Sequence, residues 1–133
     1  MNGEMNLNVL LKNMQPVLHG EYAFCLMNED SVKTLPVTPL CSFHEEEGIT
    51  IIMERAVADR LGLSYAYTGV LITLNVHSSL NAVGFLACVT SKLAEAGISV
   101  NAFSPIHHDH LFVSPEDAGR AMTLLEELSR ETA

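Results

Sequence analysis

The segment from Val70 to Ala96 constrains the fold most, because the spacing of its apolar residues changes part-way along. Up to His77, apolar side chains recur at every second position. This alternation predicts a strand with one buried face. From Ala82 to Ala96 they recur at every third or fourth position, which predicts an amphipathic helix. Gly97 is placed to end that helix.

The rest of the second half continues the same pattern. Alternation returns in residues 98–103, and a short strand is expected at residues 110–113 after a polar turn. Ser114 and Pro115 then provide a hydroxyl cap and a first helical residue for a second helix. Residues 68–133 therefore predict a βαββα lobe.

The first half has weaker signals. The connection at residues 28–39 contains two prolines and is expected to be irregular. The elements expected around it are a helix at 7–14, a strand at 22–27, hairpin strands at 40–43 and 49–53, and a helix at 54–63. We therefore expect two domains, residues 1–67 and residues 68–133, which both close with two strands and a helix.

The order of elements in residues 68–133 is most of a βαββαβ, ferredoxin-like split unit. The run VHSSLNAVGFLACVTSKLAEAGISVNAFS resembles the ACT domain family, in which a strand enters a helix through a polar turn with a glycine, here Gly84, close to the helix start. With EEEGITII and HHDHLFV, the resemblance extends over nearly the whole chain as two ACT-like halves in tandem. It implies an α+β fold with antiparallel sheets.

The resemblance also implies binding rather than catalysis. ACT domains are regulatory modules that bind amino acids or related metabolites at domain interfaces, and they commonly pair into larger sheets. The sequence departs from the family pattern in the turn expected to contact the ligand. ACT domains often carry an aspartate and a proline before the glycine of this turn, whereas this chain has Ser78, Ser79 and Asn81.

The charge of the chain limits its partners. The chain has 7 Lys+Arg and 16 Asp+Glu, which give it a formal net charge of -9. Nucleic acid and anionic membranes would be repelled, so neither is expected as a partner. The N-terminus lacks the features of a signal peptide, and no apolar run approaches the ~20 residues of a membrane span, so we expect a cytoplasmic protein.

The turn from His77 to Gly84 is the first candidate site. A helix N-terminus presents unpaired N–H groups and about half a positive charge, so it can hold an amino-acid carboxylate without a basic side chain. Asn101, on the next expected strand, could accept a hydrogen bond from the ammonium group of such a ligand. The alternative is that Ser78 or Ser79 merely caps the helix.

The histidine cluster is the second candidate site. His108 and His110 lie two residues apart and would share one face of a strand, and His77 ends the neighbouring strand. With Asp109 or Glu45 they could hold zinc, nickel or iron. The alternatives are a solvated turn with one histidine packed on the sheet, and a switch that titrates near neutral pH.

Motifs of catalysis are missing from the sequence. It contains no GxSxG nucleophile elbow and no GxxxxGK[ST] or GxGxxG phosphate loop. Cys25, Cys41 and Cys88 are far apart and form no CxxC pair, so we expect free thiols rather than a disulfide or a zinc site. An enzyme would therefore depend on the histidine cluster alone.

These patterns together predict a non-catalytic regulatory protein that binds a small molecule, an amino acid or a similar metabolite, without a cofactor or a metal. We expect a homodimer or a higher homo-oligomer, because open sheet edges invite pairing. Two alternatives stay open: a small metal-dependent enzyme that uses the histidine cluster, and a pure oligomerisation or interaction module. The expected ligand-binding residues are His77, Ser78, Ser79, Asn81, Val83, Gly84, Asn101, His108 and Asp109.

Overall fold

The computed structural model describes residues 3–132 and divides them into two compact units. The larger unit joins residues 3–19 to residues 70–132, and the smaller unit is Gly20–Gly69. These units differ from the expected sequence domains, 1–67 and 68–133, in the N-terminal arm, which packs with the second part of the chain. The division of the sequence itself at residues 67 and 68 stays a prediction.

The larger unit contains an antiparallel arrangement in which β6 pairs with both of its neighbours, β4 and β5. The start of β1, residues 16–19, adds a fourth strand, and the order is β1-β4-β6-β5. The fourth strand of this unit therefore comes from residues 16–19, which precede its other three strands in the sequence. The bounds are β1 (Pro16–Met27), β4 (Tyr67–Leu74), β5 (Asn101–Phe103) and β6 (Asp109–Val113).

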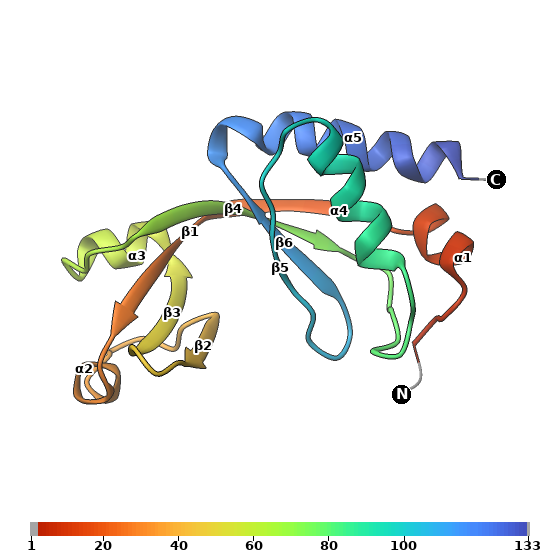
Figure 1. Ribbon diagram of the computed structural model, residues 1–133. Helices are drawn as coiled ribbons and strands as arrows, with labels where there is room; N and C mark the ends of the chain where they lie inside the picture. The colour runs from red at the N-terminus through yellow and green to blue at the C-terminus, as the bar shows by residue number, and fades with distance from the viewer. Residues whose placement is uncertain (1–2, 133) are drawn as a thin grey trace. The chain divides into compact units, whose positions relative to one another are not determined.

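Three helices of the larger unit pack against one another and against one face of its strands (Figure 1). They are α1 (Leu7–Lys12), α4 (Phe85–Glu95) and α5 (Ala118–Glu131), the last preceded by the short 3-10 helix η1 (Pro115–Asp117). The buried core between them is aliphatic apart from one aromatic ring, because the stripes of the helices and the alternating residues of β4 and β6 face each other. Its fully buried members include Leu10, Met14, Ile72, Leu74, Val89, Leu93, Leu111, Val113 and Leu125.

The smaller unit has the strand order β2-β3-β1-β4, in which β4 contributes its first residues. Antiparallel ladders join β1 to β3 and β3 to β2. Its own core includes Ala23, Cys25, Ile51, Met53 and Ala58. The remaining elements of this unit are α2 (Glu29–Lys33), β2 (Cys41–His44), β3 (Ile49–Glu54) and α3 (Arg55–Arg60).

The predicted ferredoxin-like α+β fold with antiparallel pairing is thus confirmed, with an additional feature in the two long strands. β1 and β4 each run from one unit into the other, so each serves as a strand of both. Two expectations about single elements were wrong. Residues 29–33, expected to be irregular, form α2, and the helix expected directly after Ser79 begins only at Phe85.

Candidate functional site

The segment between β4 and α4 is a turn that the chain closes with its own hydrogen bonds. The carbonyl of Ser79 accepts from the Ala82 amide at 3.0 Å, and Ser79 Oγ accepts from the Asn81 amide at 3.1 Å. Ser79 therefore caps this turn, and neither it nor Ser78 caps α4. The prediction that these serines cap the helix was wrong, because a local serine turn competes with helical hydrogen bonding.

The N-cap of α4 is Gly84, whose φ of 93° is left-handed. Such a φ favours glycine, because a side chain would be strained there. No side chain caps this helix, and its first internal bond runs from the Cys88 amide to the Gly84 carbonyl at 2.9 Å. The amides of Phe85, Leu86 and Ala87 therefore have no acceptor within the helix.

A short N-terminal strap holds the turn from the outside. The Glu4 amide donates to the His77 carbonyl at 2.9 Å, and the Ser79 amide donates to the Glu4 carbonyl at 3.0 Å. Gly3 lies so close that a Cβ placed on it would be 2.5 Å from the Ser79 nitrogen. The amide of Ser79 is thus satisfied by the protein, whereas those at the start of α4 are left for another acceptor.

A pocket of about 160 Å³ opens at this helix start. Four of the nine expected ligand-binding residues line it together: Ser78, Ser79, Gly84 and Asp109. Its other lining residues were not anticipated from the sequence; they are Leu80, Ala82, Phe85, Leu86, Ala87, Ser104 and Pro105. The structure therefore brings the turn, the first helical residues and the loop before β6 to one place.

Within residues 3–132, Asp109 is the only ionisable residue that lines this pocket. It pairs in register with the core residue Leu74, so its side chain lies on the helix-covered face of the strands. It is 7% exposed, and within residues 3–132 its carboxylate makes no hydrogen bond and no ion pair. Its carboxylate lines the pocket and is therefore available to accept a hydrogen bond from a ligand.

The other five expected residues do not line the pocket. Asn81 and Val83 point to solvent from the turn, and Val83 is 84% exposed. Asn101 is exposed at the start of β5, opposite Phe112 rather than near Asp109. His77 and His108 lie on neighbouring segments, discussed next.

Five histidines of the described residues form two groups in the larger unit. On β6, His110 Nδ1 lies 2.9 Å from Thr73 Oγ1, which lies 3.1 Å from His19 Nε2. Because a hydroxyl has one hydrogen, it can donate to only one of these rings and must accept from the other. His108 Nδ1 lies 3.3 Å from the Val76 carbonyl. Burial, followed by the nearby charge of His108, lowers the pKa of His110.

The second group is a ring stack. The His77 and His107 rings have centroids 4.9 Å apart, and His77 Nε2 is buried without a hydrogen-bond partner among the described residues. The ring centroids of His108, which directly precedes β6, and His110 are 6.5 Å apart. Among residues 3–132, no three His, Cys, Asp or Glu side chains are grouped so as to hold a metal ion.

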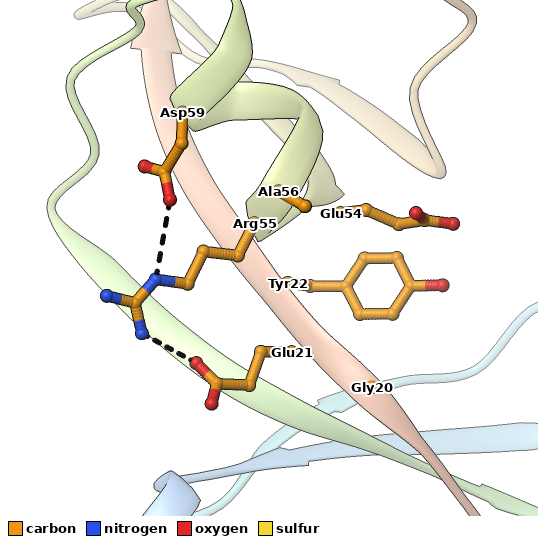
Figure 2. A pocket seen from close by; sticks show the side chains of 7 residues that line it. All are labelled: Gly20, Glu21, Tyr22, Glu54, Arg55, Ala56 and Asp59. Carbon is orange, nitrogen blue, oxygen red and sulfur yellow. Dashed lines mark hydrogen bonds and ion pairs between the residues drawn. The ribbon is translucent and has the colours of Figure 1, made fainter.

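A second, larger pocket of about 540 Å³ lies in the smaller unit (Figure 2). The Arg55 side chain lines this pocket, and its guanidinium lies between two carboxylates. Arg55 Nη1 is 2.8 Å from Glu21 Oε2, and Arg55 Nε is 3.9 Å from Asp59 Oδ2. The Glu21 hydrogen bond is the main cause that raises the pKa of Arg55. Tyr22 and Glu54, which are opposite each other on β1 and β3, complete the wall, and burial followed by the Glu54 charge raises the pKa of Tyr22.

The polar groups of this second pocket are largely engaged with one another, and its carboxylates are exposed or half-buried. Its guanidinium is already engaged by Glu21 and Asp59, whereas the Asp109 carboxylate of the pocket at the start of α4 makes no hydrogen bond and no ion pair within residues 3–132. The pocket at the start of α4 is therefore the stronger candidate for ligand binding, although it is the smaller of the two.

Comparison with known protein families gives two matches, both described as ACT domain, over residues 2–69 and residues 68–127. The chain belongs to the ACT domain family. Two ACT domains in tandem thus account for the two halves, and family membership supports a regulatory, ligand-binding role.

Solved structures similar to this ACT protein include one with high sequence identity. A crystal structure of a Vibrio cholerae protein of unknown function, described as a possible transport protein, is 41% identical over 92% of this chain and 95% of that chain, with a TM-score of 0.81. The regulatory subunit of aspartate kinase from Thermus flavus is 7% identical, with a TM-score of 0.60 over 85% of this chain and 95% of that chain. The latter likeness concerns the fold alone. No curated protein matches the sequence.

The sequence did not predict several residues of the pocket at the start of α4. It also did not predict that His19 and Thr73 lie in one hydrogen-bonded group with His110. Ser104 and Pro105 stand just before the histidine cluster, so their position in a loop facing the turn was a usable signal. His19 and Thr73 are 54 residues apart, and no local pattern connects them. Among the helices in the described part of the chain, none has the length and apolar character needed to cross a bilayer.

Proposed function

We propose that this ACT protein is a non-catalytic regulatory protein that binds an amino acid in the pocket at the start of α4. One observation carries the proposal: uncapped helical amides and a buried carboxylate without a hydrogen bond line the same pocket. The amides suit the carboxylate of an amino acid, and Asp109 suits its ammonium group.

Ser78, Ser79 and Gly84 serve this site in different ways under the proposal. Ser78 is 8% exposed and its hydroxyl donates only a long bond, 3.4 Å, to the Ser79 carbonyl, so it can turn to a ligand. Gly84 starts the helix without a side chain that would cover the amides. The remaining expected residues, His77, Asn81, Val83, Asn101 and His108, act at most as surroundings of the pocket.

We also propose that the protein forms homo-oligomers. β5 and β2 are the outermost strands in the order of the larger and the smaller unit, and an outermost strand can pair with a strand of another chain. The exposed side chains of Leu26 and Phe43, at 61% and 63%, add apolar surface to the smaller unit. Light scattering across a concentration series measures the assembly directly, and a monomer at all concentrations would contradict this part of the proposal.

The binding proposal is tested by isothermal titration calorimetry of the purified protein against each of the twenty standard amino acids. We expect saturable binding of at least one of them, with a matching rise in the midpoint of thermal unfolding, because a ligand that binds only the folded state stabilises it. No heat of binding and no thermal shift with any of the twenty at millimolar concentration would contradict amino-acid binding.

A further inference from the structure

We infer that the pocket at the start of α4 is specific for a small α-amino acid with an uncharged side chain, and that Asp109 recognises its ammonium group. The inference rests on the proposed function and adds to it the class of ligand and the group that selects it. Three features of the pocket carry it: its size, its charge and the character of its walls.

Size sets the first limit. The pocket has a volume of about 160 Å³. Pockets for larger organic ligands are about 300–1,000 Å³. The site therefore fits a ligand of the size of glycine, alanine or serine, whereas an aromatic or long side chain would extend out of it.

Charge sets the second limit. Among the described residues Asp109 is the single ionisable residue of the lining, and it is more than nine-tenths buried without a hydrogen bond or an ion pair within residues 3–132. An ammonium group beside it would complete a charge-assisted hydrogen bond. A second carboxylate on the ligand would be repelled by Asp109 and would find no Lys, Arg or His among the described residues of the pocket wall.

The walls set the third limit. The first residues of α4, whose amides have no acceptor within the helix, and Asp109 line the same pocket. The rest of the lining includes the apolar residues Leu80, Ala82 and Pro105 and the hydroxyl residues Ser78, Ser79 and Ser104. Such a surface accepts a methyl or hydroxymethyl side chain and offers a charged one no compensation.

A structural role for Asp109 is the competing explanation, because a carboxylate near a helix start also stabilises the helix dipole. The two roles are separated by ligands that differ in one group. Wild-type protein is titrated with L-alanine, with propionate, which lacks the ammonium group, and with L-glutamate, L-lysine and L-phenylalanine. We expect L-alanine to bind at least tenfold more tightly than each of the others.

The variant Asp109→Asn is then compared with Glu126→Gln, which removes one charge from the exposed face of α5. Asp109→Asn should weaken L-alanine roughly ten- to hundredfold and leave propionate unchanged or slightly tighter, because only the ammonium contact is lost. Glu126→Gln should bind both ligands like the wild type. Equal affinity of wild type and Asp109→Asn for L-alanine would overturn the assignment.

The inference and the proposed function fail in different ways. If an acidic, basic or aromatic amino acid binds more tightly than L-alanine, glycine and L-serine, the inference is overturned and amino-acid binding stands. If no amino acid binds, both are overturned. Should Asp109→Asn fail to fold, the comparison of L-alanine with propionate in the wild type still decides, because equal affinities would contradict recognition of the ammonium group.

Discussion

Asp109 and His110 are consecutive residues of β6, and their side chains leave the strand on opposite faces. Asp109 lies in register with Leu74 on the helix-covered face, and His110 lies in register with Thr73 on the other face. One strand therefore separates the candidate ligand pocket from the hydrogen-bonded line of His19, Thr73 and His110. The two polar sites are neighbours, although they share no side chain.

His110 makes the stability of the protein dependent on pH. Burial and the nearby rings of His108 and His19 lower its pKa, and the charge of Asp109 only partly opposes this. The unfolded chain, in which a histidine has a pKa of about 6.5, therefore takes up this proton more readily than the folded protein. We expect the free energy of unfolding to decrease as pH falls below about 6.5, by at most about 1.4 kcal/mol per pH unit from this residue.

Urea unfolding curves recorded between pH 5 and pH 8 measure this dependence. His110→Gln should flatten it while keeping a side chain that can hydrogen-bond Thr73. His44→Gln is the matched control, because His44 is exposed on the edge strand β2. An unchanged pH slope in His110→Gln would show that another group controls the acid response.

Among single residues, the sequence predicted those of the turn better than those that meet across strands. Ser78, Ser79 and Gly84 could be placed at one site because they are close in sequence. The polar turn was also expected to include Asp109, but its burial could not be predicted, because it depends on how β6 pairs with β4. Asn101 was misplaced for the same reason: register decides which end of β5 lies near the pocket.

At the scale of elements, the start of α4 decides whether a binding site exists. The sequence predicted a helix here from its apolar period but placed its start too early, because the serine turn and the left-handed Gly84 delay the helix to Phe85. This delay makes room for the pocket. Had Ser79 capped the helix, its hydroxyl would have satisfied one of the amides that now lack a helical acceptor.

The N-terminal strap fixes the position of the turn, and this leads to a prediction for Gly3. In Gly3→Ala the new Cβ would meet the backbone at Ser78 and Ser79, which cannot move away as a flexible side chain would. We expect the strap to detach and the free energy of unfolding to decrease by about 1–3 kcal/mol, as in other overpacked sites. Hydrogen exchange at the Ser79 amide, bonded to the Glu4 carbonyl at 3.0 Å, should become faster.

Gly119→Ala is the control for this substitution. Gly119 lies in α5, and a Cβ there would meet nothing within 4 Å. Alanine favours a helix over glycine by about 1 kcal/mol, so this variant should be as stable as the wild type or more stable. If Gly3→Ala retains wild-type stability and slow exchange at Ser79, the strap does not hold the turn.

At the scale of the whole molecule, β1 and β4 each contribute residues to both compact units. A lobe of βαββα in residues 68–133 could be predicted from local periodicity, and so could its need for one more strand. The source of that strand could not be predicted, because pairing between residues 16–19 and β4 is non-local and the sequence PVLH carries no strand alternation.

The two ACT domains also differ in their capacity to hold a carboxylate. The counterpart of α4 in the smaller unit is α2, a helix of 5 residues. Its first turn carries Glu29 and Asp30, and the Asn28 side chain accepts from the Ser31 amide at 2.8 Å. These negative charges and this cap oppose binding of an anion, so the account predicts one ligand per chain, bound in the larger unit.

The central claim is that the free amides at the start of α4 receive the carboxylate of a small amino acid. An amide-resolved NMR titration of the ¹⁵N-labelled protein with L-alanine, repeated with L-serine, tests it most directly. The account predicts saturable shifts that are largest at the amides of Phe85, Leu86 and Ala87 and fit one site per chain. Largest shifts within residues 20–69, or no saturable shift with either amino acid at millimolar concentration, would contradict it.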